Sequence, residues 1–354
     1  MEQLVSFPER EPMLSKRLQN SQQISLDQSD VPNLRACYHC PALETLQIGT
    51  ATALRDHELQ TPIDTDTLIH YMGQPSMRTM ILQDMRVVVT DDRSQSRYPP
   101  IEDLHLNRLG RLSSLELRRV NINADALVKL FRTCTDLRAF TLTRPSGDRA
   151  AVLLDELADN LRNVSCSLTS LTLGYNSVHK SPEITLLPSL RNMKTLLHLQ
   201  IDPSMYLGRR LCPYRLPNHP VVVTRPASSF ADLLPDGVQT LTLDIDMEQV
   251  MRLPDYRRDI ITSIIGARAH LPNLAEITLF EDEAAGAAAV NMCSCGQCYR
   301  QVGRIWRGNP GRRSADETQE RREFVKQLRK MDVKLFRDIG DGAGRYECTA
   351  WGSA

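Results

Sequence analysis

Apolar residues recur along the chain in one short pattern: an apolar anchor, two variable residues, a second anchor, one variable residue and a third anchor. The first anchors of successive matches are 25 to 42 residues apart. One match arises by chance in a leucine-rich chain, whereas eight indicate a repeat of about thirty residues. The eight are Leu43/Leu46/Ile48, Met77/Met80/Leu82, Leu112/Leu115/Leu117, Leu137/Phe140/Leu142, Leu168/Leu171/Leu173, Leu196/Leu199/Ile201, Val238/Leu241/Leu243 and Leu274/Ile277/Leu279. A ninth match, Ile101/Leu104/Leu106, begins only 11 residues before Leu112, and the pattern leaves open which of these two heads the repeat.

Helical stripes of apolar residues follow several of these matches. The clearest stripe comes after Asn123, a residue type that often caps helices. Near the end of the chain, a charged helical segment precedes a predicted terminal strand at residues 332–336. The helices are expected at residues 124–132, 152–161, 259–269 and 317–331.

A single repeat is too small to fold alone. Burying three aliphatic side chains contributes about 5–9 kcal/mol, whereas ordering the backbone of about thirty residues costs about 1–2 kcal/mol per residue. Neighbouring repeats must therefore stack and share one core. The sequence predicts an α/β fold, a leucine-rich-repeat solenoid with a curved parallel sheet on its concave face and helices on its convex face.

Two repeats contain a cysteine three residues before the first anchor. The segments CPALETLQI (residues 40–48) and CTDLRAFTL (residues 134–142) resemble the cysteine-containing repeats of F-box-associated leucine-rich proteins. FADLLPDGVQTLTL (residues 230–243) is similar to a segment common in fungal members of that family. The resemblance covers about residues 31–336. It implies a ribonuclease-inhibitor-like architecture and, as a function, the substrate-reading part of a ubiquitin-ligase adaptor, although residues 1–30 contain no recognisable F-box.

Breaks in the repeat suggest the domain organisation. Residues 1–30, rich in Gln, Ser and Asp, are predicted to be disordered. The solenoid should occupy residues 31–282, with a Pro-rich insertion at residues 202–235 that either forms a binding surface or packs as a stiff loop on the solenoid edge. Residues 283–316 are expected to form a loop containing Cys and Arg, and residues 317–354 a terminal repeat and C-terminal cap.

Composition narrows the class of partner. Lys plus Arg and Asp plus Glu are equal at 43 each, which argues against a general nucleic-acid or membrane-surface binder. The start of the chain lacks an apolar signal region, and no stretch approaches the roughly 18 apolar residues of a membrane helix. Nine scattered cysteines fit a reducing compartment. We therefore expect an intracellular protein, cytoplasmic or nuclear.

The sequence offers no catalytic constellation. HExxH, GxSxG, Walker A and GxGxxG motifs are absent, so we expect neither an enzyme nor a cofactor. The positions that alternate with the inward anchors should instead form a mostly polar concave face for another protein, unless threonine is there only because it suits a solvated strand. The candidate partner-binding residues are Thr45, Gln47, His105, Glu116, Thr141, Thr172, His198, Gln200, Thr242 and Thr278.

A cysteine cluster is the weak candidate for a metal site. Cys293, Cys295 and Cys298 would bind zinc if a fourth ligand, such as His270 or Cys348, approached. A structural zinc site usually shows two spaced cysteine pairs, so free thiols are the preferred interpretation.

An alternative function rests on the same region. Arginines surround Trp306, and residues 293–313 would then form a metal- or nucleic-acid-binding module carried on the repeats. The other CxxC spacing, Cys37 to Cys40, is explained by the repeat itself, because Cys40 and Cys134 occupy the same position relative to their anchors.

Overall fold

The structure, a computed structural model, describes part of the 354-residue chain. The described residues are 22–26, 40–49, 62–89, 111–134, 136–143, 161, 167–174, 189–207, 226–245, 250, 254–282, 315–338 and 345–347. The chain divides into two compact units, unit 1 at residues 1–169 and unit 2 at residues 170–354.

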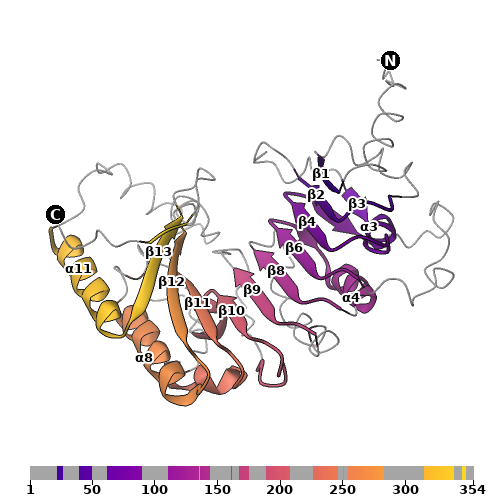
Figure 1. Ribbon diagram of the computed structural model, residues 1–354. Helices are drawn as coiled ribbons and strands as arrows, with labels where there is room; N and C mark the ends of the chain where they lie inside the picture. Colours follow the sequence, from indigo (N-terminus) through magenta and orange to yellow (C-terminus); the bar gives the residue numbers. More distant parts are fainter. Residues whose placement is uncertain are drawn as a thin grey trace, which may run out of the picture. The chain divides into compact units, whose positions relative to one another are not determined.

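Unit 1 contains parallel strands that neighbour one another in chain order (Figure 1). They are β1 (Gln23–Leu26), β2 (Thr45–Ile48), β4 (Thr79–Gln83), β6 (Ser114–Arg118) and β8 (Ala139–Thr143). Leu46 pairs with Met80, and Met80 pairs in turn with Leu115. Leu115 of β6 pairs in turn with Phe140 of β8. These second anchors are all buried, so equivalent residues of successive repeats form one apolar row.

Unit 2 repeats this arrangement. Its parallel strands are β9 (Ser170–Gly174), β10 (His198–Ile201), β11 (Thr240–Ile245), β12 (Glu276–Asp282) and β13 (Val333–Asp338), and β14 (Arg345–Glu347) pairs antiparallel with β13. Leu199 lies between Leu171 and Leu241 in the register. Ile277 continues the row toward Val333. The terminal strand predicted at residues 332–336 is confirmed as β13.

The anchor pattern corresponds closely to burial. Every anchor of the eight triplets is buried except Leu274, which is half-buried. Leu112/Leu115/Leu117 leads into β6, so this triplet heads a repeat, whereas Ile101/Leu104/Leu106 lies outside the described residues. The α/β class and the parallel strands are confirmed in both units.

The same backbone link recurs between successive repeats in both units. In unit 1 the carbonyl of Arg78 accepts from both the Ser113 and Ser114 N–H groups, at 2.9 Å each. In unit 2 the carbonyl of Gln239 accepts from Ala275 and Glu276, at 2.9 and 3.1 Å. The link lies just before the strand and satisfies two donors with one acceptor. It holds the register between successive strands.

Helices cover the buried side of each unit's strands. Unit 1 has α3 (Thr65–Met72) and α4 (Ala124–Thr133), and unit 2 has α8 (Pro254–His270) and α11 (Ala315–Lys330). The predicted cap of α4 is confirmed, because Asn123 Oδ1 accepts from the Ala126 N–H at 2.9 Å. The helices predicted at residues 259–269 and 317–331 are also confirmed. Of residues 152–161, only Leu161 is described.

Unit 1 contains a second small sheet that the sequence did not predict. It joins β3 (Pro62–Asp64), β5 (Arg86–Val88) and β7 (Asn121–Ile122) in parallel. Each of these strands buries one aliphatic residue: Ile63, Val87 or Ile122. Two or three residues are too few to show a periodic pattern.

The prediction that residues 1–30 are disordered is wrong for β1. Gln23–Leu26 pairs in parallel with β2 and buries Ile24 and Leu26. The polar composition around this strand obscured an alternating pattern of only four residues. The other residues of this segment, apart from Gln22, lie outside the described part.

The Pro-rich insertion at residues 202–235 packs into unit 2 at both of its ends. One end forms α6 (Ser204–Leu207), and the other forms the short 3₁₀ helices η4 (Ala227–Ser229) and η5 (Ala231–Leu233). Tyr206 and Phe230 are buried and stack with ring centroids 3.9 Å apart. These ends are therefore core rather than exposed surface, and residues 208–225 lie outside the described part.

Candidate functional site

The positions that alternate with the buried anchors form an open strand face in each unit, partly exposed and mostly polar. In unit 1, β-sheet register places Gln47 beside Ile81, and Ile81 beside Glu116. Thr141 follows Glu116 on β8. Three predicted partner-binding residues, Gln47, Glu116 and Thr141, therefore belong to one row, and Thr45 lies in the row next to it.

Unit 2 brings its predicted residues together more completely. Thr172 pairs with Gln200, and Gln200 pairs with Thr242. Thr278 comes next on β12, and Lys334 ends the row on β13. Since neighbouring strands are about 4.8 Å apart, this row is a continuous line of polar side chains across adjacent repeats. His105, the remaining predicted residue of the first half of the chain, lies outside the described residues.

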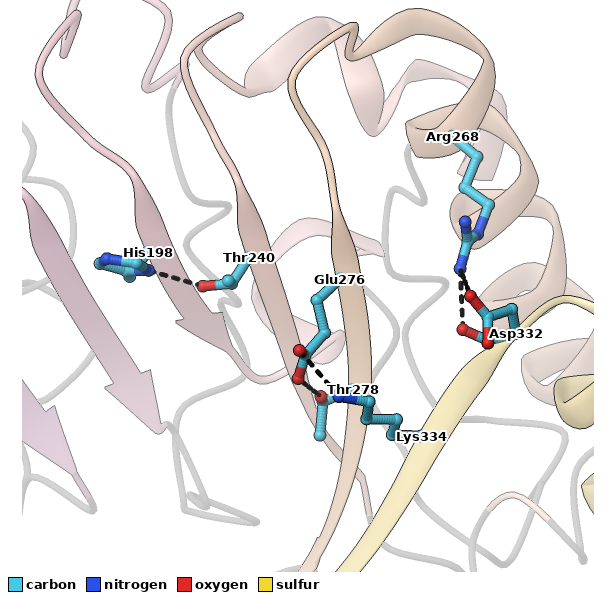
Figure 2. Close-up of polar contacts among 7 residues, drawn as sticks. All are labelled: His198, Thr240, Arg268, Glu276, Thr278, Asp332 and Lys334. Carbon is cyan, nitrogen blue, oxygen red and sulfur yellow. Dashed lines mark hydrogen bonds and ion pairs between the residues drawn. The ribbon is translucent and has the colours of Figure 1, made fainter.

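A second row in unit 2 runs beside the first. His198 lies between Ser170 and Thr240 in the register, and Glu276 follows Thr240. His198 Nδ1 is 2.8 Å from Thr240 Oγ1, and Figure 2 shows the two side chains pointing toward each other. His198 is exposed as predicted, yet its ring already has a hydrogen-bonding neighbour on the next strand.

Glu276 is the charged centre of this face (Figure 2). Lys334 Nζ donates to one of its carboxylate oxygens at 2.9 Å, and Thr278 Oγ1 donates to the other at 3.2 Å. The hydrogen bond from Lys334 is the main reason that the pKa of Glu276 lies below its ordinary value of 4.5, with a smaller contribution from Thr278 and a partial opposing effect of burial. The carboxylate is thus held ionised and in a fixed orientation.

One predicted site residue is less accessible than expected. Thr278 was expected on the exposed face, but its relative exposure is only 8%. It lies between Thr242 and Lys334 and directs its hydroxyl to Glu276, so neighbouring side chains cover it. The alternation of side chains along a strand predicts the face on which a residue lies, but not how far neighbouring side chains cover it.

Four residues that build this face are not among the predicted partner-binding residues. Thr240, Asp244, Glu276 and Lys334 each contact a predicted residue or a partner of one, and Gln200 Nε2 donates to Asp244 Oδ1 at 2.7 Å. Thr240 and Glu276 were visible as positions two residues after their first anchors. The contribution of Lys334 was not visible, because its strand lacks an apolar first anchor: Lys330 occupies the position that Leu274 has in the preceding repeat.

A second ion pair, between α8 and the residue that precedes β13, fixes the turn into this strand. Arg268, near the end of α8, donates through Nη2 to the Asp332 carbonyl at 2.8 Å, and its Nη2 is 3.8 Å from Asp332 Oδ2 (Figure 2). Asp332 has φ of 52°, a left-handed conformation that is uncommon for a residue other than glycine. The contact therefore connects helix and strand at the point where Lys334 enters the open face.

Cys40 and Cys134 are core residues, as the repeat register predicted. Both side chains are buried. Burial raises the pKa of Cys134 from 9.0 to about 12, despite a hydrogen bond with Thr133 that acts in the opposite direction. A neutral buried thiol is a poor metal ligand. Cys37 lies outside the described residues.

The candidate metal site also lies outside the described part of the chain. This applies to Cys293, Cys295, Cys298 and Cys348. His270 is described; it is exposed and places Nδ1 2.9 Å from the Gly266 carbonyl on its own helix. Within the described ranges, no group of three or more His, Cys, Asp or Glu side chains is arranged to hold a metal ion.

The two open faces offer hydrogen-bonding groups in straight rows rather than around one reacting atom. Such an arrangement suits contact with a broad surface. None of the helices described is both long enough and apolar enough to cross a membrane. Neither the comparison with models of known protein families nor the comparison with curated proteins finds a match to this chain.

Proposed function

We propose that the protein is a noncatalytic recognition scaffold, a leucine-rich-repeat solenoid that binds another protein through its open strand faces. The observation that carries the proposal is the row formed by Thr172, Gln200, Thr242 and Thr278, which backbone pairing places in register on four successive strands. Four residues selected from the sequence as partner-binding candidates are neighbours in one line.

The chemistry of this row supports protein recognition. Its members are uncharged, and Lys334 and Glu276 at one end are already paired with each other. Partners that bind such a face need not desolvate an isolated charge, which is costly. Side chains that are held by neighbours also lose little conformational freedom on binding. Both features favour a specific, hydrogen-bonded protein interface.

The resemblance of the repeats to F-box-associated leucine-rich proteins gives the proposal its most specific form. In that form, the chain is the substrate-reading part of a ubiquitin-ligase adaptor, and the protein bound by the open face is the substrate. The basis is the sequence of three segments, residues 40–48, 134–142 and 230–243. The alternative module at residues 293–313 lies outside the described residues.

Capture of partners by the tagged full-length chain tests the proposal. The test variant carries Thr141→Arg and Thr172→Arg, which place bulky charges on the open face of unit 1 and unit 2. A matched control carries Ala269→Arg and Gln327→Arg, at exposed positions of α8 and α11. Both variants add the same charge.

We expect a partner that binds stoichiometrically to wild type and to the control, and that the open-face variant loses. Binding is confirmed with the purified partner by calorimetry. A partner retained equally by both variants, or no stoichiometric partner at all, would count against recognition through this face. Recovery of ubiquitin-ligase scaffold subunits with the partner would support the adaptor role.

A further inference from the structure

Three exposed arginines lie together at the edge of unit 1 from which its strands begin. Arg78 and Arg138 immediately precede β4 and β8 by one residue, and Arg111 lies in the turn before β6. Backbone links place Arg78 next to Ser113, and Ser113 next to Arg138. The three arginines therefore come from three successive repeats and lie on one edge.

Two of these guanidinium groups are held in place by backbone carbonyls. Arg78 Nη1 donates to the Arg111 carbonyl at 3.3 Å, and Arg111 Nη1 donates to the Pro75 carbonyl at 3.1 Å. Pro75 belongs to the turn that leads to Arg78, which is closed by the Met77 N–H donating to the Gln74 carbonyl at 3.1 Å. Each arginine thus reaches to the turn of the other.

This arrangement leaves most of the donors of both groups available. A guanidinium has five N–H donors in a planar fork, and each backbone contact uses one of them. The carbonyls are neutral, so they orient the two cations without cancelling their charge. An anionic group placed against them would engage the open donors.

Three basic residues elsewhere in unit 1 are neutralised by carboxylates. Arg118, Arg119 and Lys129 each form an ion pair with a carboxylate. Arg78, Arg111 and Arg138 form no ion pair within the described residues. Glu44 and Asp136 are exposed carboxylates near the starts of β2 and β8, on the same edge. Neither forms an ion pair with any of the three arginines within the described residues.

We propose that Arg78, Arg111 and Arg138 form a docking edge for an acidic segment of a protein partner, one that presents glutamate or aspartate side chains. Arginine binds carboxylates in a bidentate geometry, and three forks on successive repeats match an extended acidic segment better than a single ion. The proposal rests on the proposed function, since it names the chemistry of the partner, but it places the contact on the edge of unit 1 rather than on the open face.

Fluorescence anisotropy with the full-length chain tests this edge directly. The probe is a short fluorescein-labelled peptide of alternating glutamate and serine, titrated at low and at physiological salt. The test variant is Arg78→Gln with Arg138→Gln. The matched control is Arg86→Gln with Arg132→Gln. These substitutions remove the same charge at exposed arginines of β5 and α4.

We expect the test variant to weaken peptide binding by about fivefold to tenfold and the control by less than about twofold, because exposed arginine–carboxylate pairs contribute modestly but additively. Salt should weaken wild-type binding, since it screens exposed charges. Arg111→Lys keeps the charge but loses the planar fork, and it should bind the peptide less tightly than wild type.

Equal weakening by the two double variants would assign the effect to general charge and overturn the proposal, as would the absence of wild-type binding at low salt. Tighter, equally arginine-dependent binding of a single-stranded oligonucleotide would overturn the assignment to a protein segment. If the peptide fails to bind while the partner of the open face is still captured, only the docking edge is refuted, and the proposed function stands.

Discussion

Asp84 and Arg119 occupy equivalent positions of successive repeats and hold each other through two hydrogen bonds. Arg119 Nε donates to Asp84 Oδ1 at 2.5 Å, and Nη2 donates to Oδ2 at 2.6 Å. Each residue directly follows its strand, β4 or β6, with a positive φ of 53° or 51°. Their N–H groups donate to Arg118 and Thr143 carbonyls on the next strand. The ion pair thus fixes two strained turns at the ends of neighbouring strands.

Substitutions at Arg119 should separate the contribution of the ion pair to stability from the cost of the backbone strain. Arg119→Ala removes the pair and keeps a side chain in the left-handed region, whereas Arg119→Gly removes the pair and relieves the strain. The Arg119 side chain is 38% exposed and that of Asp84 14%, so solvent reduces the contribution of the pair to about 1 kcal/mol. Glycine should recover about 1 kcal/mol relative to alanine.

Urea unfolding, followed by circular dichroism, measures both effects. We expect Arg119→Ala to lower the free energy of unfolding by about 1 kcal/mol, and Arg119→Gly to be close to wild type because the relieved strain offsets the lost pair; Arg132→Ala on α4 should also be close to wild type. Equal stability of the glycine and alanine variants would show that the positive φ carries no strain.

The ion pair between Glu276 and Lys334 should make the stability of unit 2 depend on pH. The folded-state pKa of Glu276 is lowered, so the carboxylate stabilises the fold above its ordinary pKa of 4.5, and this contribution is lost as the pH falls through the lower folded value. The two side chains are 42% and 47% exposed, which limits the contribution to less than about 1 kcal/mol.

Lys334→Gln should therefore raise the pKa of Glu276 toward its ordinary value, as measured by NMR of glutamate-labelled protein. The stability difference from wild type should be present at neutral pH and disappear in acid. A Glu276 pKa that Lys334→Gln leaves unchanged would contradict the hydrogen bond in Figure 2 as the main cause of the lowered value.

Cys134 should behave as a packed side chain and not as a reactive thiol. Burial raises its pKa from 9.0 to about 12, so the folded thiol stays neutral where an unfolded one ionises. Its contribution to stability is complete below about pH 9 and decreases as the pH rises toward 12, because only the unfolded state releases the proton in that range.

Iodoacetamide labelling of the native protein at about pH 8, read by mass spectrometry, should leave Cys134 unmodified and label it fully after denaturation. Cys40, which is buried at the equivalent position, should be protected in the same way. Rapid native labelling of either cysteine would contradict its place in the core.

The sequence predicted the buried side of this fold better than its exposed side. The anchors and the cap at Asn123 follow from local spacing, because burial repeats with the strand and helix periods. β1 and the sheet of β3, β5 and β7 were missed because such short strands are stabilised by their neighbours and not by their own pattern.

The candidate site was predictable in its positions but not in its contacts. The row from Thr172 to Thr278 follows directly from the repeat. The Glu276–Lys334 pair joins residues 58 positions apart, and the Asp84–Arg119 pair joins equivalent positions of two repeats. Such pairs depend on side-chain orientation across the register, which no local pattern encodes.

We expect successive repeats to bury their apolar rows against each other and not to be stable separately. Phe140 on β8 is the most direct probe in unit 1, because it is buried in the same row as Leu115 and contacts Phe131 of α4 edge-on, with ring centroids 4.9 Å apart. Phe140→Ala should destabilise the unit by about 3–5 kcal/mol. Hydrogen exchange read by mass spectrometry then shows how far the loss extends. A shared core predicts faster exchange in β6 and β4 as well as β8, whereas faster exchange confined to β8 and α4 would contradict it.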